Sequence, residues 1–326
     1  MFNRGQIVEL EITDYAFGGR GIAKITTEDG NFIVFVDNAF PGQKVSAKIT
    51  TKRKKHAESN LVEVIQRSEF ETETQFQEIS GGPYIRIPLS KQGEYKQKST
   101  LDTFSRLSGI QNIDSLFDTF IESPEAYFYR NKMEYSFSSI EHIPETGEEI
   151  DDAFALGFKR RGTWWKVESL KKPSGLFDEQ WETFIYKIQD FLRNTNLPAW
   201  HPPQKVGFFR HIVVRKSFSQ DKLLINLVTS SEGIETFDRQ AFVDFILSEM
   251  GDRIAGIQHT INDNVADRAK IENGENKLIY GAPVVTENLL GLSFEISMES
   301  FFQTNPACAE LLYAKALDYF FEEPFA

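Results

Sequence analysis

Short runs of apolar residues, separated by turn residues, fill the first part of the chain. The runs lie at 7–12, 32–36, 44–50 and 61–65, with Gly-rich or Pro-Gly turns at 18–21 and 41–42. Apolar or alternating runs of this length, bounded by Gly and Pro, are typical of β-strands. Their close spacing predicts a small all-β barrel of the OB-like type over residues 1–67.

A different pattern follows this segment. Residues 68–90 are acidic and polar with little apolar periodicity, which indicates a linker, and 91–107 carry apolar residues at helical spacing. From 91 to 285 strands alternate with helices, which predicts an α+β central domain. The strands are expected at 133–139, 155–160, 212–216, 223–229 and 256–261, and the helices at 178–195 and 238–250.

One more helix is expected near the end of the chain. Asn305 is a favourable N-cap, and Pro306 suits the first helical position because its missing N–H would have no partner there. Together these patterns predict a multidomain protein.

Composition limits the class of protein. The 326 residues are 40% hydrophobic and 26% charged, as in ordinary globular proteins. No run approaches the ~18 apolar residues of a membrane-spanning helix, and the first residues do not resemble a signal peptide, so a cytoplasmic location is expected. The single cysteine, Cys308, excludes an intramolecular disulfide and a metal or iron–sulfur site built from cysteines of this chain.

The charge distribution allows only a local surface for nucleic acid. The formal net charge is -12, which opposes a general electrostatic grip on phosphates. Residues 1–67, however, carry 10 Lys and Arg against 8 Asp and Glu. Within them, Lys52, Arg53, Lys54 and Lys55 fall where a hairpin loop is expected, and we expect them to contact RNA phosphates unless they form a plain solvated loop.

Three segments together resemble the RNA 5-methyluridine (uracil-C5) methyltransferase family, whose members modify 23S rRNA or tRNA. The first, Gly5-Gln6-Ile7-Val8 with Gly18-Gly19-Arg20-Gly21-Ile22-Ala23 and Phe40-Pro41-Gly42-Gln43-Lys44-Val45, resembles a TRAM domain, an RNA-binding β-barrel. The second is Tyr129-Arg130-Asn131-Lys132-Met133-Glu134-Tyr135 with Leu156-Gly157-Phe158-Lys159-Arg160-Arg161-Gly162, and the third is Ser300-Phe301-Phe302-Gln303-Thr304-Asn305-Pro306. Their order and spacing resemble the family across nearly the whole chain.

Two features depart from that family. Many members bind an iron–sulfur cluster through cysteines, but the corresponding segments here read Ser80-Gly81-Gly82-Pro83 and Ser169-Leu170-Lys171-Lys172, so no cluster is expected. In the family a Rossmann-like domain with the cofactor loop, the nucleophilic Cys and a carboxylate base follows the third segment. We therefore expect residues 286–326 to be only the start of an α/β Rossmann-like methyltransferase domain, and this chain alone to be inactive.

The resemblance implies a function. The intact protein would use S-adenosyl-L-methionine to methylate C5 of a uridine extruded from structured RNA, more often 23S rRNA because TRAM-like domains accompany that branch. Uracil C5 is a weak nucleophile, so a thiolate must first add to C6. Alternatives are a tRNA substrate, another target base, or a non-catalytic RNA-binding module.

The third segment supplies two candidate site residues. Gln303 matches the family position that contacts the cofactor, and Phe301 matches the one that packs near the target base. The alternative is that Phe301 and Phe302 are core residues and that Gln303 bonds to local backbone.

Further RNA-contact candidates are basic. Arg130 and Lys132, two apart on an expected strand, would share a face suited to holding phosphates or a loop backbone. Lys159, Arg160 and Arg161 precede Trp164 and Trp165, a mixture suited to single-stranded RNA, although most aromatic rings here must be core. Arg20 lies in a Gly-rich turn. Solvated surface is the alternative for each.

The remaining reactive side chains are assigned no chemistry. Cys308 lies within the helix that starts at Pro306, away from the family's nucleophile position, and is interpreted as a buried structural cysteine. The five His residues show no metal-ligand spacing.

Overall fold

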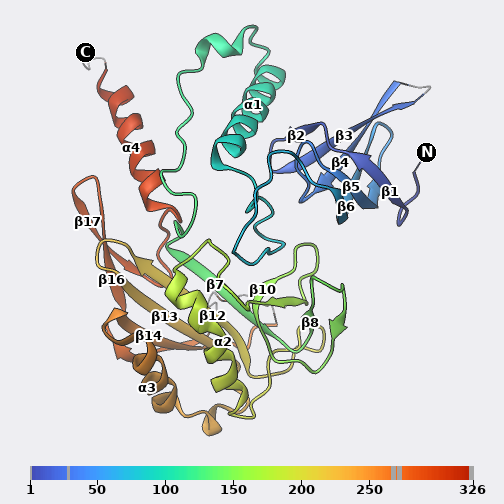
Figure 1. The fold of residues 1–326 in the computed structure, drawn as a ribbon. Helices are drawn as coiled ribbons and strands as arrows, with labels where there is room; N and C mark the ends of the chain where they lie inside the picture. Colours follow the sequence, from blue (N-terminus) through green and yellow to red (C-terminus); the bar gives the residue numbers. More distant parts are fainter. Residues whose placement is uncertain (1, 28–29, 266–268, 270–273, 323–326) are drawn as a thin grey trace. The chain divides into compact units, whose positions relative to one another are not determined.

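The computed structural model describes residues 2–27, 30–265, 269 and 274–322 (Figure 1). The chain divides into two compact units. The first lies within 1–75 and 82–122, and the second within 76–81 and 123–326.

The first unit begins with a six-stranded sheet in the order β1-β5-β6-β4-β3-β2. Neighbouring strands are antiparallel except β4 and β6, and three register shifts between β5 and β6 bend that pair. Alternate side chains such as Val34, Val36, Val45 and Ala47 are fully buried in the core. The strands are β1 (Ile7–Glu11), β2 (Asp14–Ala16), β3 (Arg20–Thr27), β4 (Gly30–Asp37), β5 (Lys44–Lys52) and β6 (His56–Gln66). A small all-β unit, with a hairpin loop at 53–55, is confirmed.

Helix α1 (Leu89–Ser108) confirms the predicted helix and is followed by the short 3₁₀ helix η1 (Ile113–Leu116). The helix packs against the β-sheet of the first unit: the Tyr95 ring lies 5.1 Å from that of Phe40, and Lys98 Nζ lies 2.9 Å from Asp14 Oδ1. Because of these contacts the helix belongs to the first unit, whereas the sequence placed it in a central domain of residues 91–285.

The second unit is built on a nine-stranded mixed sheet in the order β15-β14-β13-β12-β7-β10-β11-β8-β9. Two pairs are parallel, β13 with β14 and β8 with β11. The predicted α+β arrangement is confirmed, as are the predicted strands and helices. The elements of this unit are β7 (Lys132–Ser138), β8 (Glu141–His142), β9 (Glu149–Ile150), β10 (Ala155–Lys159), β11 (Val167–Ser169), α2 (Glu179–Arg193), β12 (Phe209–Ser217), β13 (Lys222–Thr229), η2 (Ile234–Thr236), α3 (Arg239–Met250), η3 (Gly251–Arg253), β14 (Ile254–Ile261) and β15 (Glu275–Gly281). Strands β8, β9, β11 and β15 and the two short 3₁₀ helices were not predicted from the sequence.

Helices α2 and α3 cover one face of this sheet (Figure 1). Trp181, Ile188 and Phe242 are fully buried between the helices and the strands. This apolar layer fixes the position of the strand ends that carry the candidate residues below.

A hairpin and a helix end the described chain: β16 (Val284–Leu289), β17 (Leu292–Ser297) and α4 (Pro306–Phe321). Val285 and Ile296 pack on Val213, Leu224 and Val228 of the nine-stranded sheet. The hairpin therefore belongs to the second unit, and the expectation that residues 286–326 are only the start of a Rossmann-like domain is not supported. Asn305 caps α4 through Cys308 N, with Pro306 in the first turn, as predicted.

The predicted linker contains no helix or strand between 67 and 88, yet part of it is firmly attached. Within the second unit, Gln77 donates to Ser169 O at 2.8 Å and accepts from Lys171 N at 2.7 Å. Ser80 N donates to Glu168 Oε2 at 3.2 Å. The segments around Ser80 and Ser169, where the resembling family carries cysteines, are thus joined here by hydrogen bonds.

Candidate nucleic-acid interface

The most distinctive feature of the second unit is the loop between β17 and α4, residues 298–305. Met298 and Phe302 pack into the apolar cluster below it. Phe301, in contrast, is 87% exposed at the crest of the loop, which rules out a core role for this ring. Gln303 is also exposed. The loop therefore exposes an aromatic ring and an amide two positions apart in the sequence.

Three side chains hold the backbone of this loop: Lys132 of β7, Arg215 of β12, and Asn131, which immediately precedes β7. Arg215 Nη2 donates to Met298 O at 3.3 Å and to Ser300 O at 2.6 Å. Lys132 Nζ donates to Met298 O at 3.2 Å. Asn131 Nδ2 donates to Gln303 O, and its backbone N–H to Thr304 O, both at 2.9 Å. The loop is fixed on both sides of Phe301.

The two cations under the loop are direct cross-strand partners in the register of β7 and β12. Arg215 is 1% exposed and Lys132 is half-buried. Burial lowers the pKa of Lys132, and the positive charge of Arg215 lowers it further. Burial likewise lowers the pKa of the Arg215 guanidinium. Among the described residues neither cation forms an ion pair with a carboxylate.

Arg130 lies beside this cluster but outside the strand. Strand β7 begins at Lys132, so the predicted shared strand face for Arg130 and Lys132 does not form. The Arg130 N–H donates to Leu176 O at 3.0 Å, and its side chain is half-buried. Lys132 turns toward the loop backbone, and a phosphate would have to compete with Met298 O for its ammonium group.

The turn from β10 to β11 combines cations with an exposed tryptophan. Trp164 is 56% exposed and meets Trp165 edge to face, so it is not a core residue. Arg160 contacts His142; burial lowers the pKa of this imidazole and the Arg160 charge lowers it further. Lys159 is half-buried, Arg161 is exposed, and the Arg161 N–H donates to Ser80 Oγ.

The two RNA-contact candidates in the first unit, Arg20 and the loop 52–55, differ in whether their charges are already paired. The Arg20 side chain already contacts two carboxylates, Asp37 at 3.3 Å and Glu58 at 3.2 Å, which neutralise its charge. Lys52, Arg53, Lys54 and Lys55 are all exposed between β5 and β6, and in the described part of the chain none forms an ion pair. The hairpin loop is thus the stronger phosphate-binding candidate.

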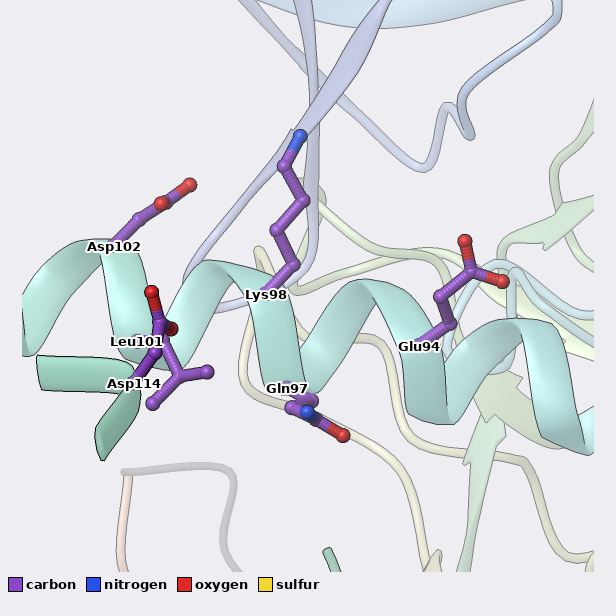
Figure 2. A pocket seen from close by; sticks show the side chains of 6 residues that line it. All are labelled: Glu94, Gln97, Lys98, Leu101, Asp102 and Asp114. Atoms are coloured by element: carbon purple, nitrogen blue, oxygen red, sulfur yellow. The ribbon is translucent and has the colours of Figure 1, made fainter. Parts of the chain in front are cut away.

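A hollow of about 280 Å³ runs along α1 (Figure 2). Glu94, Gln97, Lys98, Leu101 and Asp102 of α1 line it together with Asp114 of η1. Three carboxylates against one ammonium group make this hollow unsuited to phosphate, and none of the residues proposed from the sequence lines it.

Cys308 is partly exposed on α4, whereas the sequence predicted a buried position. The first turn of α4 starts at the surface loop, which explains the exposure. Across the described ranges no group of three or more His, Cys, Asp or Glu side chains could hold a metal ion. No helix among these residues is both long and apolar enough to cross a membrane.

Sequence reasoning assigned no role to Asn131 or Arg215. Asn131 could have been found, because it lies inside the second family-like segment between two candidates. Arg215 gave a weaker signal, a cation inside the apolar run 212–216 that was predicted to be a strand. A buried Arg needs acceptors, and only the fold shows that these are carbonyl groups 83 and 85 residues away.

Comparison with known proteins gives three findings. Residues 2–62 match the TRAM domain family. An uncharacterized RNA methyltransferase from Clostridium tetani is 32% identical over 97% of this chain, and one from Caldanaerobacter subterraneus subsp. tengcongensis is 31% identical over 97%. Both alignments span 66% of the relative, just under two thirds of its length.

A solved structure is also similar. It is a Pyrococcus abyssi tRNA (uracil-54, C5)-methyltransferase in complex with S-adenosyl-L-homocysteine, with a TM-score of 0.59 and 17% identity, covering 95% of this chain and 64% of that one. At this identity the likeness concerns the fold alone. The alignments give no support to the expectation that this chain is an inactive fragment. The chain thus carries a TRAM domain and is similar, over nearly all of its residues, to proteins named RNA methyltransferases.

Proposed function

We propose that this chain binds structured RNA for an S-adenosyl-L-methionine-dependent RNA (uracil-C5) methyltransferase. The observation that carries the proposal is the 87% exposed Phe301 on a loop whose backbone is held by Asn131, Lys132 and Arg215. An exposed ring is available to a partner, and an unstacked base is the partner that an aromatic side chain commonly takes in RNA recognition.

The proposed role of the loop follows from the energetics of base extrusion. A uridine inside folded RNA must leave its stack before it can react, at a cost of a few kcal/mol. Stacking on Phe301 recovers part of that cost. Surface cations, above all at 52–55, supply binding energy from the phosphates. Trp164 with Lys159, Arg160 and Arg161 is proposed as a second contact for unpaired nucleotides.

For the cofactor we propose Gln303 as a contact. Its exposed side-chain amide makes no hydrogen bond with another described residue, so it is available to a polar ligand. S-adenosyl-L-methionine would supply the methyl group. We assign no catalytic role to Cys308, because it lies in the first turn of α4 and not at the position of the family's nucleophile.

In this proposal residues 1–67 bind RNA, and the second unit holds the extruded uridine. We propose 23S rRNA as the substrate. The similar tRNA methyltransferase structure supports a tRNA substrate as the second candidate. Binding of transcripts of both RNAs under identical salt distinguishes the two.

Replacement of Phe301 by alanine tests the proposal. With a hairpin RNA that carries one unpaired loop uridine, we expect F301A to bind roughly 5- to 100-fold more weakly, because one base–aromatic stack contributes about 1–3 kcal/mol. With the same hairpin carrying an abasic site, the variant and the native protein should bind equally. Fluorescence anisotropy measures both.

The matched control is F104A, which removes another exposed phenylalanine, on α1 and outside the candidate set. The proposal is wrong if F301A binds both hairpins as the native protein does, or if it weakens both equally.

Replacing Lys52, Arg53, Lys54 and Lys55 together by alanine should weaken binding and flatten its salt dependence. The slope of log K against log salt concentration should lose about 0.7–0.9 for each phosphate contact removed, hence up to about 3.6 if each of the four side chains contacts one phosphate. A filter-binding titration between low and moderate salt measures this slope. The variant K171A/K172A, which removes two exposed lysines outside the candidate set, is the control. An unchanged slope would exclude the loop from the interface.

A further inference from the structure

The bonding of Arg215 is unusual for a buried cation. Its guanidinium is almost inaccessible to solvent, yet its acceptors are the neutral carbonyls of Met298 and Ser300. Its Nε and Nη1 atoms are buried without a hydrogen-bond partner. A buried charge normally requires an ionic partner or a full set of hydrogen bonds. Arg215 has neither.

Lys132 makes this arrangement more costly. The ammonium group lies directly across the β7–β12 ladder from Arg215 and donates to the same carbonyl, Met298 O. Like charges directly opposite each other on a sheet destabilise it. Neutral donors such as glutamine could bond to these carbonyls without that repulsion. The pair is therefore poorly explained by stability alone.

The bonds from Arg215 fall on the carbonyl groups of Met298 and Ser300, three residues and one residue before Phe301. Ser300 O is the carbonyl of the residue immediately before Phe301, so the bond to Arg215 at 2.6 Å restricts the backbone on which the exposed ring is mounted. Asn131 restricts the other side at Gln303 O and Thr304 O. A ring that protrudes from the surface has few side-chain neighbours of its own, so its direction depends on the backbone.

We propose that Arg215, assisted by Lys132, is a positioning residue for RNA recognition: it holds the 298–300 backbone so that the Phe301 ring stands out, preformed, to receive an unstacked base. This inference rests on the proposed function. A preformed loop has already lost its conformational freedom when RNA arrives, so less binding energy is spent on ordering it.

The inference predicts that Arg215 acts through Phe301. R215Q removes the charge and the two-carbonyl contact, and should weaken binding of the hairpin with one unpaired uridine about tenfold. In the F301A background the same substitution should change binding less than about twofold, because the ring to be positioned is gone. A purely structural loss would weaken binding by the same factor in both backgrounds.

A measurement without RNA tests whether Arg215 restricts the backbone of the loop. Amide hydrogen exchange at residues 299–304 should be at least about tenfold faster in R215Q, while exchange in α2 and β13 stays unchanged. The milder variants R215K, which keeps the charge, and K132Q, which keeps a donor, should give intermediate exchange. They also keep the test valid if R215Q does not fold.

Different results would contradict the proposed function and the positioning role of Arg215. If native protein and F301A bind the uridine and abasic hairpins alike, the proposed function is wrong, whatever the exchange rates. If F301A behaves as predicted but R215Q and R215K leave loop exchange unchanged, or weaken binding equally with and without Phe301, Arg215 is not a positioning residue.

Discussion

Replacement of Asp178 by alanine is expected to lower the free energy of unfolding of the second unit by about 3–5 kcal/mol, as when one partner of a buried ion pair is removed. Asp178 Oδ2 lies 2.7 Å from Lys216 Nζ and 2.6 Å from Arg253 Nη2. Its Oδ1 accepts from Trp181 N at 3.0 Å and so caps α2. The substitution would leave two cations without their most buried partner and remove the cap. Urea denaturation monitored by tryptophan fluorescence measures the change.

Asp221 provides a matched control, because it contacts the same Lys216 and Arg253 but is 62% exposed. D221A should cost no more than about 1 kcal/mol, since water screens an exposed pair. A loss in D221A as large as that in D178A would show that burial is not the cause.

The effect of D178A should also depend on pH. Burial acts to raise the pKa of Asp178, but hydrogen bonds from Arg253 and Lys216 outweigh it and lower that pKa from 3.8 to about 2. A carboxyl with a lowered folded-state pKa stabilises the protein above its unfolded pKa and ceases to do so as the pH falls through the folded one. The difference between native protein and D178A should therefore shrink between pH 3.8 and about 2.

The sequence predicted helices and strands of this protein better than it predicted which compact unit each of them belongs to. Strands β7, β10, β12, β13 and β14 and helices α2 and α3 were foreseen because each carries a clear apolar pattern, as in the buried run of β13. The short strands β8, β9 and β11 and the exposed strand β15 carry no such pattern and were not foreseen. Helix α1 was foreseen too, but not its unit, because its contacts with Tyr15, Phe40 and Asp14 come from rings and charges distant in sequence.

Strand β3 shows a second limit of sequence patterns. The sequence indicated a turn at 18–21, but β3 already starts at Arg20. Both Gly18 and Gly19 adopt positive φ, so the turn is complete within two glycines. Two more residues of the predicted turn are therefore free to join the ladder.

The sequence indicated the exposed residues of the candidate site, because they belong to a family-like segment. It did not indicate the residues that hold the loop in place, because these act through contacts that only the fold creates. Phe301 and Gln303 were found through the third family-like segment, and their exposure agrees with a surface role. The residues that fix them, Asn131 and Arg215, are over 80 residues from the loop along the chain. Hydrogen bonds to backbone carbonyls leave almost no signature in a single sequence, since any residue type supplies the carbonyl.

Replacement of Glu182 by glutamine should remove a large pH dependence of the free energy of unfolding. Burial raises the pKa of Glu182 from 4.5 to about 7, although Ser174 and Tyr135 donate hydrogen bonds that act to lower it. Between these two pH values the folded protein keeps a proton on this carboxyl that the unfolded chain has lost, so raising the pH favours unfolding. The free energy of unfolding should fall by up to about 3 kcal/mol between pH 4.5 and 7, at 1.36 kcal/mol per unit of pKa shift.

E182Q should resemble the native protein at pH 4.5 and exceed its stability near pH 7.5, because an amide of the same shape is never ionised. Its carbonyl can still accept from Ser174, whose N–H donates at 2.6 Å. The control is E179Q, an exposed glutamate on the same helix, which should keep the native pH profile. If denaturation curves of E182Q and native protein shift in parallel from pH 4.5 to 7.5, Glu182 is ionised throughout, and its hydrogen bonds, not its burial, determine its charge.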